Sequence, residues 1–239
     1  MSRSLRIVLT LSRGVAAKLG AELKDLDEGV LGRVHARIYV VEFQKWGLPH
    51  AHILVILAEE DKPRTRQIID KMVSAELPDK DKNPQLYETV TTCMIHGPCG
   101  AAHPNTVCMK AGKCTKHFPK PLSEVTKGNV AEYPVYRRRR RATGVVLING
   151  KEYDNETVNQ WMVSSNPYLS QKHNCHINLE VCTAVTAVKY LYKCVYKGSD
   201  NAVITVEAVR GEGNRTRRGG PYAERGTRRR LSPTTSYGS

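Results

Sequence analysis

Two histidines stand one residue apart in "GLPHAHILVIL" (residues 47–57), where His50 and His52 lead into a continuous apolar run. Side chains two residues apart on a β-strand point to the same face, so both imidazoles can reach one ligand. The run from Ile53 to Leu57 is typical of a strand buried on both faces, which holds the pair rigidly. The pattern predicts a metal site, and surface histidines near a turn are the alternative.

A second group of candidate ligands occupies "CMIHGPCGAAHPNTVCMKAGKCTKHF" (residues 93–118), where regular apolar periodicity disappears. His96 and Cys99 are separated by two residues, a spacing that lets one turn present two ligands to a tetrahedral ion. Thiolates and imidazoles suit zinc, and four such ligands leave no open position, so we expect a structural site. Cysteines without a metal in a reducing compartment are the alternative. The candidates are Cys93, His96, Cys99, His103, Cys108, Cys114 and His117.

A third segment, "AVKYLYKCVYKG" (residues 187–198), has apolar residues at helical spacing and a glycine at its end. Lys193 follows Tyr190 by three positions, and Lys197 follows Cys194 in the same way. Side chains three apart are neighbours on a helix. A lysine there can stabilise a phenolate or hold a phosphate against it, as covalent attack on phosphorus requires. Ordinary packing of half-buried tyrosines and surface lysines is the alternative.

The composition favours a polyanionic partner, because 37 Lys and Arg against 23 Asp and Glu give a formal net charge of +14. We find no signal peptide and no apolar stretch near the length that crosses a bilayer, so no membrane partner is expected. A reducing, intracellular compartment follows as the expectation for the seven cysteines. The chain has no phosphate-binding Walker loop.

The elements that must position these residues are predicted from periodicity. We expect a helix within residues 5–31, a hairpin formed by 34–43 and the histidine strand, and a helix over about 65–75. The Gly, Arg and Ser-rich region beyond Gly198 is expected to be disordered. A run of arginines is predicted to contact phosphates without reading sequence, with nuclear import as a second use and a solvated charge run as the alternative. The run is Arg137, Arg138, Arg139, Arg140 and Arg141.

Three long motifs resemble one family. They are "EFQKWGLPHAHIL", "HGPCG" followed by "PNTVCMKAGKCTKHFPKP", and "NPYLSQKHNCHINLEVCTAVTAVKYLYKCVYKG". Over roughly residues 20–200 the chain resembles the Rep endonuclease domain of Helitron rolling-circle transposons, the Helitron-like N-terminal domain. The resemblance implies an α+β HUH endonuclease with a ferredoxin-like core, a central antiparallel sheet and a zinc-binding insert. The implied division is an N-terminal helical segment (1–33), the HUH domain (34–198) with its zinc insert (93–120), and a basic disordered tail (199–239).

The chemistry that the resemblance implies is nicking and strand transfer of single-stranded DNA. A divalent ion, Mg²⁺ or Mn²⁺, polarises the scissile phosphate while a tyrosine attacks and stays joined to the 5′ phosphate. Tyr190 matches the first family tyrosine, with Lys193 and Lys197 beside the reacting groups, and Cys194 replaces the second. The implied ligands of the catalytic ion are His50 and His52 with Gln44 as the third ligand and Glu42 in reserve. The implied zinc ligands are His96, Cys99, Cys108 and Cys114, with Cys93 and His117 as alternatives.

The expected partners are single-stranded DNA and a helicase, encoded with the domain in relatives or supplied in trans. The expected location is the nucleus. Two features favour a competing interpretation: Cys194 stands at the second tyrosine position, and no helicase follows the tyrosine segment. The alternative function is therefore a catalytically decayed, transposon-derived and zinc-stabilised DNA-binding protein.

Overall fold

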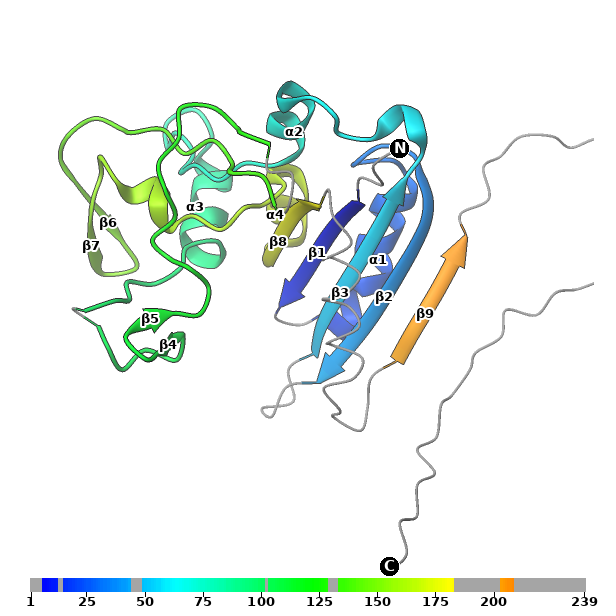
Figure 1. Ribbon diagram of the computed structural model, residues 1–239, viewed down its shortest axis with the longest axis horizontal. Helices are drawn as coiled ribbons and strands as arrows, with labels where there is room; N and C mark the ends of the chain where they lie inside the picture. Colours follow the sequence, from blue (N-terminus) through cyan, green and yellow to red (C-terminus); the bar gives the residue numbers. More distant parts are fainter. Residues whose placement is uncertain are drawn as a thin grey trace, which may run out of the picture.

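The protein is built on a five-stranded antiparallel sheet with a second lobe beside it (Figure 1). The computed structural model describes residues 6–12, 15–43, 49–101, 103–128, 133–182 and 203–208. The strand order is β8-β1-β3-β2-β9, and each strand runs antiparallel to its neighbours. The strands are β1 (Arg6–Ser12), β2 (Val34–Phe43), β3 (Pro49–Leu57), β8 (His176–Cys182) and β9 (Val203–Ala208).

The predicted hairpin over residues 34–57 is confirmed as β2 and β3, paired antiparallel from Phe43 opposite Pro49 back to Val34 opposite Leu57. β3 lies between β1 and β2 at the centre of the sheet, which is why its sequence is apolar on both faces. Ala51, Ile53 and Val55 have no exposed surface. The histidines thus stand at the start of the most buried strand.

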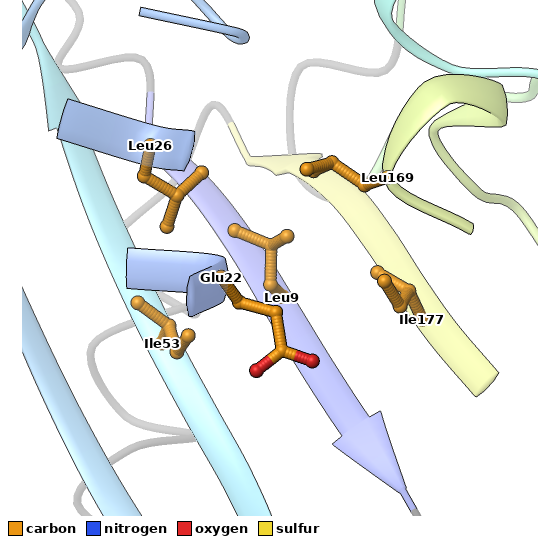
Figure 2. A pocket seen from close by; sticks show the side chains of 6 residues that line it. All are labelled: Leu9, Glu22, Leu26, Ile53, Leu169 and Ile177. Atoms are coloured by element: carbon orange, nitrogen blue, oxygen red, sulfur yellow. The ribbon is translucent and has the colours of Figure 1, made fainter. Parts of the chain in front are cut away.

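Helix α1 (Val15–Asp27) covers one face of the sheet. Its Leu23 and Leu26 pack with Leu9 of β1 and Ile53 of β3, because apolar residues three and four apart form one stripe on a helix. Figure 2 shows a small cavity in this layer, into whose apolar lining the Glu22 carboxylate projects.

A buried polar cluster accompanies this layer. His173 Nε2 lies 2.7 Å from a carboxylate oxygen of Asp25, and its Nδ1 lies 3.9 Å from Glu22. Glu22, Asp25 and His173 are all 5% exposed or less. Buried carboxylates need hydrogen-bonding or charged partners, and His173 of helix α4 (Pro167–His173) supplies them. The cluster therefore links α1 to α4.

The second lobe is inserted between β3 and β8 and has a core of its own. The inserted segment contains helices α2 (Arg66–Met72), whose Ile69 and Met72 pack in the core of the sheet, and α3 (Pro84–Cys93). Its hairpins are β4 (Met109–Lys110) with β5 (Lys113–Cys114) and β6 (Val145–Ile148) with β7 (Lys151–Asp154). Helix α4 leads from this lobe into β8. The core residues are Leu77, Val90, Met94, Ile148, Tyr153, Val158 and Met162.

Helix α2 confirms the helix predicted over about 65–75, although it ends earlier, at Met72. It starts where Thr65 acts as N-cap and its hydroxyl accepts a hydrogen bond from the Ile68 amide at 3.3 Å.

The outer edge of β8 is covered by the second lobe. The Leu179 amide donates to the Ser164 carbonyl at 2.9 Å, and the Val181 amide donates to the Tyr136 hydroxyl at 2.8 Å. The Ile177 amide contacts the Met94 sulfur at 3.4 Å. These contacts satisfy donors that an edge strand would otherwise leave open to pairing with another chain.

Two expectations about the ends of the fold were wrong. The helix expected within residues 5–31 is confirmed as α1, but strand β1 precedes it in the segment 1–33 that was expected to be helical, because "RIVLTLS" is rich in residues that favour strands. The tail expected to be disordered contains β9, whose Val203–Ala208 pairs with β2. The alternation of Ile204, Val206 and Ala208 with Thr205 and Glu207 is a strand signal, but the Gly, Arg and Ser-rich composition around it led to the expectation of disorder.

The predicted α+β class with a central antiparallel sheet is confirmed. The predicted division of the chain into domains stays a prediction. Within the described ranges, no helix combines the length and apolarity needed to cross a membrane.

Candidate functional site

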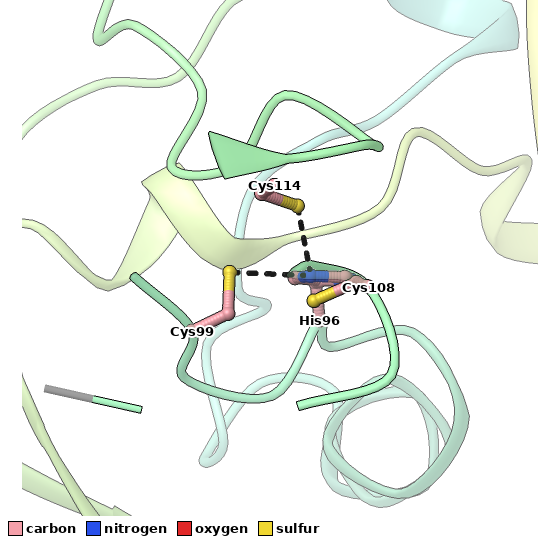
Figure 3. A group of neighbouring side chains, drawn as sticks. All are labelled: His96, Cys99, Cys108 and Cys114. Atoms are coloured by element: carbon pink, nitrogen blue, oxygen red, sulfur yellow. Dashed lines mark hydrogen bonds between the residues drawn. The ribbon is translucent and has the colours of Figure 1, made fainter. Parts of the chain in front are cut away.

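Four of the seven predicted ligands converge in the second lobe (Figure 3). The ligand atoms of His96, Cys99, Cys108 and Cys114 all lie within 4.8 Å of one another. His96 Nε2 lies 3.6 Å from the sulfur of Cys99 and 3.6 Å from that of Cys114. In the part of the chain that the structure describes, these four residues form the one group of Cys, His, Asp or Glu side chains close enough together to bind the same ion.

The spacing of these atoms fits a tetrahedral zinc site. With a Zn–S bond of about 2.3 Å, a Zn–N bond of about 2.05 Å and a tetrahedral angle, the nitrogen and sulfur should be about 3.6 Å apart. Both distances from His96 Nε2 equal 3.6 Å. The cluster can therefore hold a metal such as zinc with little rearrangement, and four protein ligands make the site structural.

The pKa shifts in the cluster are those expected of buried metal ligands without a bound cation. Burial, with the neighbouring Cys114 and Cys108, raises the pKa of Cys99 to about 12, because a second thiolate nearby is unfavourable. Burial also opposes ionisation of Cys114, but amide donors of Phe118 and Lys116 outweigh it and lower its pKa. Burial lowers the pKa of His96, which favours the neutral imidazole that a metal requires.

The local fold explains why these four residues meet. His96 follows the end of α3, where its amide donates to the Trp161 carbonyl at 2.8 Å, and its ring stacks on Phe118 with centroids 4.2 Å apart. Cys108 and Cys114 flank the β4–β5 hairpin, whose strands pair Met109 with Cys114. The chain thus brings the hairpin ligands back onto the turn that carries the first two.

The remaining candidates of this segment lie outside the cluster. Cys93 is the last residue of α3, and its carbonyl accepts a hydrogen bond from His176. His103 and His117 are exposed. The four ligands implied by the resemblance are thus the four that the structure brings together, and the alternatives Cys93 and His117 are not among them.

His50 and His52 lie on the sheet face opposite α1. Ala51 and Ile53, which alternate with them, belong to the core beneath α1, whereas Leu54 packs on the other face with Val40. The two imidazole centroids are 6.3 Å apart, and His52 is 5% exposed. The shared face predicted from their spacing is therefore observed.

The strand register extends this polar face across the sheet. Glu42 of β2 is paired with His50, His50 with Ser12 of β1, and Ser12 with His176 of β8. His176 was not singled out from the sequence, although the alternation of "HINLEV" marks a strand with one polar face. Its Nδ1 lies 2.7 Å from the Cys93 carbonyl, and since a carbonyl only accepts, Nδ1 carries the proton of this bond.

The same face contains buried charge. Burial raises the pKa of Glu180, and the Ser164 hydroxyl lies 2.7 Å from its carboxylate. Burial lowers the pKa of Lys120, which follows the zinc ligands, and the nearby Glu180 carboxylate opposes this shift. The zinc segment and the histidine face are thus neighbouring parts of one structure, joined through β8.

Several predicted residues lie outside the described residues. These are the third ligand Gln44, the nucleophile Tyr190 with Lys193 and Lys197, and Cys194 at the second tyrosine position. Glu42 is described through its backbone, which places it opposite His50. Their predicted roles stay predictions.

The arginine run is engaged within the protein. Arg138 is 4% exposed, and its Nη1 donates to the carbonyls of Ala75, Asn159 and Met162 at 3.2, 2.8 and 2.6 Å. Burial lowers its pKa to about 10, against the favourable charge of Glu180. Arg138 thus ties three segments of the second lobe together from the inside.

The other four arginines also have partners in the chain. Arg139 and Arg140 keep 52% and 60% of their side-chain surface exposed. Contact of the run with DNA stays a prediction, and Arg139 and Arg140 are the two arginines of the run with exposed side chains. The partners are Asp70 and Glu76 for Arg137, Glu76 for Arg139, Glu156 for Arg140, and Asn155 and the Leu77 carbonyl for Arg141.

The comparison with protein families agrees with the histidine strand. Residues 12–55 match the family described as the Helitron helicase-like domain at the N-terminus. This segment of the chain is Helitron-related. The matched stretch runs from the end of β1 through α1 and β2 into β3, and it includes His50 and His52. This relation associates the chain with transposons. No curated protein sequence matches it.

Proposed function

We propose that this Helitron-related chain is a metal-dependent endonuclease that nicks single-stranded DNA and transfers the strand through a covalent phosphotyrosine. The observation that carries the proposal is the pair His50 and His52 on one face of the central strand, within the segment that matches the Helitron family. The fold we propose is a ferredoxin-like HUH core. It is supported by the order β8-β1-β3-β2 and by the crossovers through α1 and α4, each of which links two strands separated by one neighbour.

The donor set on the histidine face fits a divalent ion. Two imidazoles supply nitrogen ligands, and the third ligand comes from Gln44 or Glu42; the register of Glu42 opposite His50 supports the reserve candidate. When bound, Mg²⁺ or Mn²⁺ supplies a positive charge that polarises the scissile phosphate. The covered, packed sheet beneath keeps the imidazoles in place, because Ala51 and Ile53 between and beside them are fully buried.

The chain's own nucleophile in this proposal is Tyr190. Its phenolate oxygen forms a bond to phosphorus, the bond from phosphorus to the 3′ oxygen breaks, and the leaving oxygen takes a proton to become a 3′ hydroxyl. Lys193 and Lys197 offset charge on the phenolate and the phosphate. The adduct retains the phosphodiester bond energy, so a 3′ hydroxyl can later reverse the step and join a new strand.

The proposal extends to partners. Single-stranded DNA is the substrate, a helicase in trans or in longer relatives supplies the single strand, and the nucleus is the site of action. The +14 net charge supports a polyanionic substrate.

A test uses a pool of single-stranded oligonucleotides with random internal sequence, labelled at the 3′ end, with Mn²⁺ and a denaturing gel. The labelled strand should move with the protein, because the 5′ phosphate of the 3′ fragment is the one captured. His50→Ala, His52→Gln and Tyr190→Phe should abolish the shifted band. His35→Ala, on the exposed surface of the same hairpin, is the matched control and should retain it.

The competing function is a zinc-stabilised DNA-binding protein that has lost catalysis, which Cys194 in place of a second tyrosine favours. It predicts DNA binding with no covalent adduct for the parent protein in Mg²⁺ or Mn²⁺. That single result would replace the endonuclease proposal.

A further inference from the structure

The zinc segment has a one-sided charge. Residues 93–120 contain four lysines and no Asp or Glu. Lys110, Lys113 and Lys116, here called the hairpin lysines, are all exposed. Among the residues that the structure describes, none of the three forms a salt bridge, whereas other lysines such as Lys62 and Lys172 do. The positive charge of this surface is therefore left for something outside the chain.

This surface contrasts with the arginine run, which is the more conspicuous basic feature of the sequence. Every arginine of that run donates to a carboxylate, amide or carbonyl of the chain. A phosphate would have to compete with these internal partners at the arginines. At the hairpin lysines it would replace water alone.

The hairpin places like charges directly opposite one another. Lys110 pairs with Lys113 across the two-residue turn of Ala111 and Gly112, both of which have positive φ, at 48° and 73°. That turn geometry is the one that closes a tight hairpin. Like charges at directly paired positions destabilise a hairpin in isolation, so the arrangement favours a bound anion.

The metal ligands fix the position of these charges. Cys108 lies two residues before Lys110, and Cys114 lies between Lys113 and Lys116. The Lys116 amide lies 3.4 Å from the Cys114 sulfur, and the Thr115 amide donates to the Cys108 carbonyl at 2.8 Å. The backbone below the ammonium groups is thus held by the zinc cluster, and binding an anion orders only the side chains.

We infer that the hairpin lysines form the surface that binds the phosphate backbone of single-stranded DNA. The choice of single-stranded DNA rests on the proposed function. Lysine ammoniums act as point charges on phosphates, so these contacts are independent of base sequence. An anionic membrane is disfavoured, because the hairpin region exposes one large apolar residue, Val107, and membrane-surface binding needs a broad apolar face.

The test measures the affinity of the full-length, zinc-loaded protein for a fluorescent single-stranded oligonucleotide at several salt concentrations, without Mg²⁺ or Mn²⁺. The triple variant K110Q/K113Q/K116Q is compared with a control that removes the same charge from exposed lysines elsewhere. For single strands each lost phosphate contact lowers the salt slope by about 0.7, so the hairpin variant should lose about 2. The control slope should stay near that of the parent. The control lysines are Lys71, Lys80 and Lys127.

Zinc content is measured for both variants, and one zinc per chain shows that the hairpin variant is folded. Equal salt slopes for the two triple variants would overturn the inference, because net charge alone would then explain binding. Equal loss of binding to phosphatidylserine vesicles and to DNA would overturn it in favour of a membrane surface. Val107→Ser should leave the DNA slope unchanged.

The covalent-adduct assay separates this inference from the proposed function. If the parent protein forms the adduct and the hairpin variant binds like the parent, the inference fails and the endonuclease stands. If no adduct forms while the slope falls by about 2, the surface stands and the endonuclease fails.

Discussion

Arg138 offers a quantitative test of how the second lobe is held together. Arg138→Met keeps much of the volume of the side chain and removes the donor that three carbonyls share. A buried acceptor without a partner costs about 1–3 kcal/mol, and loss of one member of a buried charged network costs about 3–5 kcal/mol. Since the three bonds share one nitrogen, their costs do not add fully, and we expect a loss of about 3–5 kcal/mol in the free energy of unfolding.

The matched control for Arg138→Met is Arg140→Met. Arg140 has 60% of its side-chain surface exposed and pairs with Glu156 through one ion pair, so its replacement should cost less than about 1 kcal/mol. For a chain of this size 1 kcal/mol shifts the Tm by about 2–4 °C, which predicts a fall of roughly 6–20 °C for Arg138→Met and under about 4 °C for the control.

Both variants should be measured by urea unfolding and by thermal melting followed by circular dichroism. An unchanged urea slope would show that the two variants expose the same surface on unfolding. If Arg138→Met and Arg140→Met lowered the Tm equally, the assignment of Arg138 as an internal tie would be refuted, and the run would have to be treated as one solvated charged segment.

Three further outcomes follow from the structure. Zinc binding at pH 7 should release protons, because the pKa of Cys99 is raised to about 12 and its thiol must ionise to bind the metal. Calorimetry in buffers of different ionisation enthalpy measures this release, and an absence of proton release would contradict the assignment of the site. Cys114→Ser should abolish stoichiometric zinc binding. Burial opposes ionisation of Asp25, but Lys172 and His173 outweigh it and lower its pKa below 3.8. The stability that ionised Asp25 contributes should therefore be present above about pH 4 and lost as the pH falls further. Asp25→Asn should flatten this acid-induced loss of unfolding free energy, and the same pH dependence in variant and parent would contradict the prediction. Asn166→Ala should lower the free energy of unfolding, measured with urea, by about 1–2 kcal/mol. The reason is that this buried N-cap accepts a hydrogen bond from the Leu169 amide and donates one to the Met72 carbonyl, each at 2.9 Å. An unchanged free energy of unfolding would show that water replaces both bonds.

The sequence predicted what depends on local pattern. The β2–β3 hairpin follows from alternation and from the apolar run after His52, and the four zinc ligands were among the seven candidates because their residue types suit the metal. Choosing among the seven needed the family resemblance, since the spacing between Cys99 and Cys108 is too long to fix a geometry. The shared face of His50 and His52 followed from strand geometry alone.

The rest depended on residues far apart in the sequence. Arg138 donates to the carbonyl of Ala75, and Arg139 forms an ion pair with Glu76, and both partners lie far from the arginines in the sequence. The five consecutive arginines by themselves indicate only a concentration of positive charge. His176 lies on the polar face of the sheet because β8 pairs with β1, the first strand of the described chain, and this pairing cannot be predicted from local sequence. The pairing of β9 with β2 likewise joins residues far apart in the sequence, so the pattern of Val203–Ala208 alone could not place this strand.

The insertion of the second lobe between β3 and β8 sets an order for folding during synthesis. β1 pairs with β3 early, but its other neighbour, β8, is made only after the whole second lobe, with Ser12 finally opposite His176. Contacts this distant in sequence slow folding and leave intermediates with open strand edges. Until the zinc cluster and its lobe have closed, β1 presents an unpaired edge inside a growing chain. We therefore expect the supply of a metal such as zinc during translation to affect how long that edge stays exposed, and metal limitation to appear first as aggregation of nascent protein.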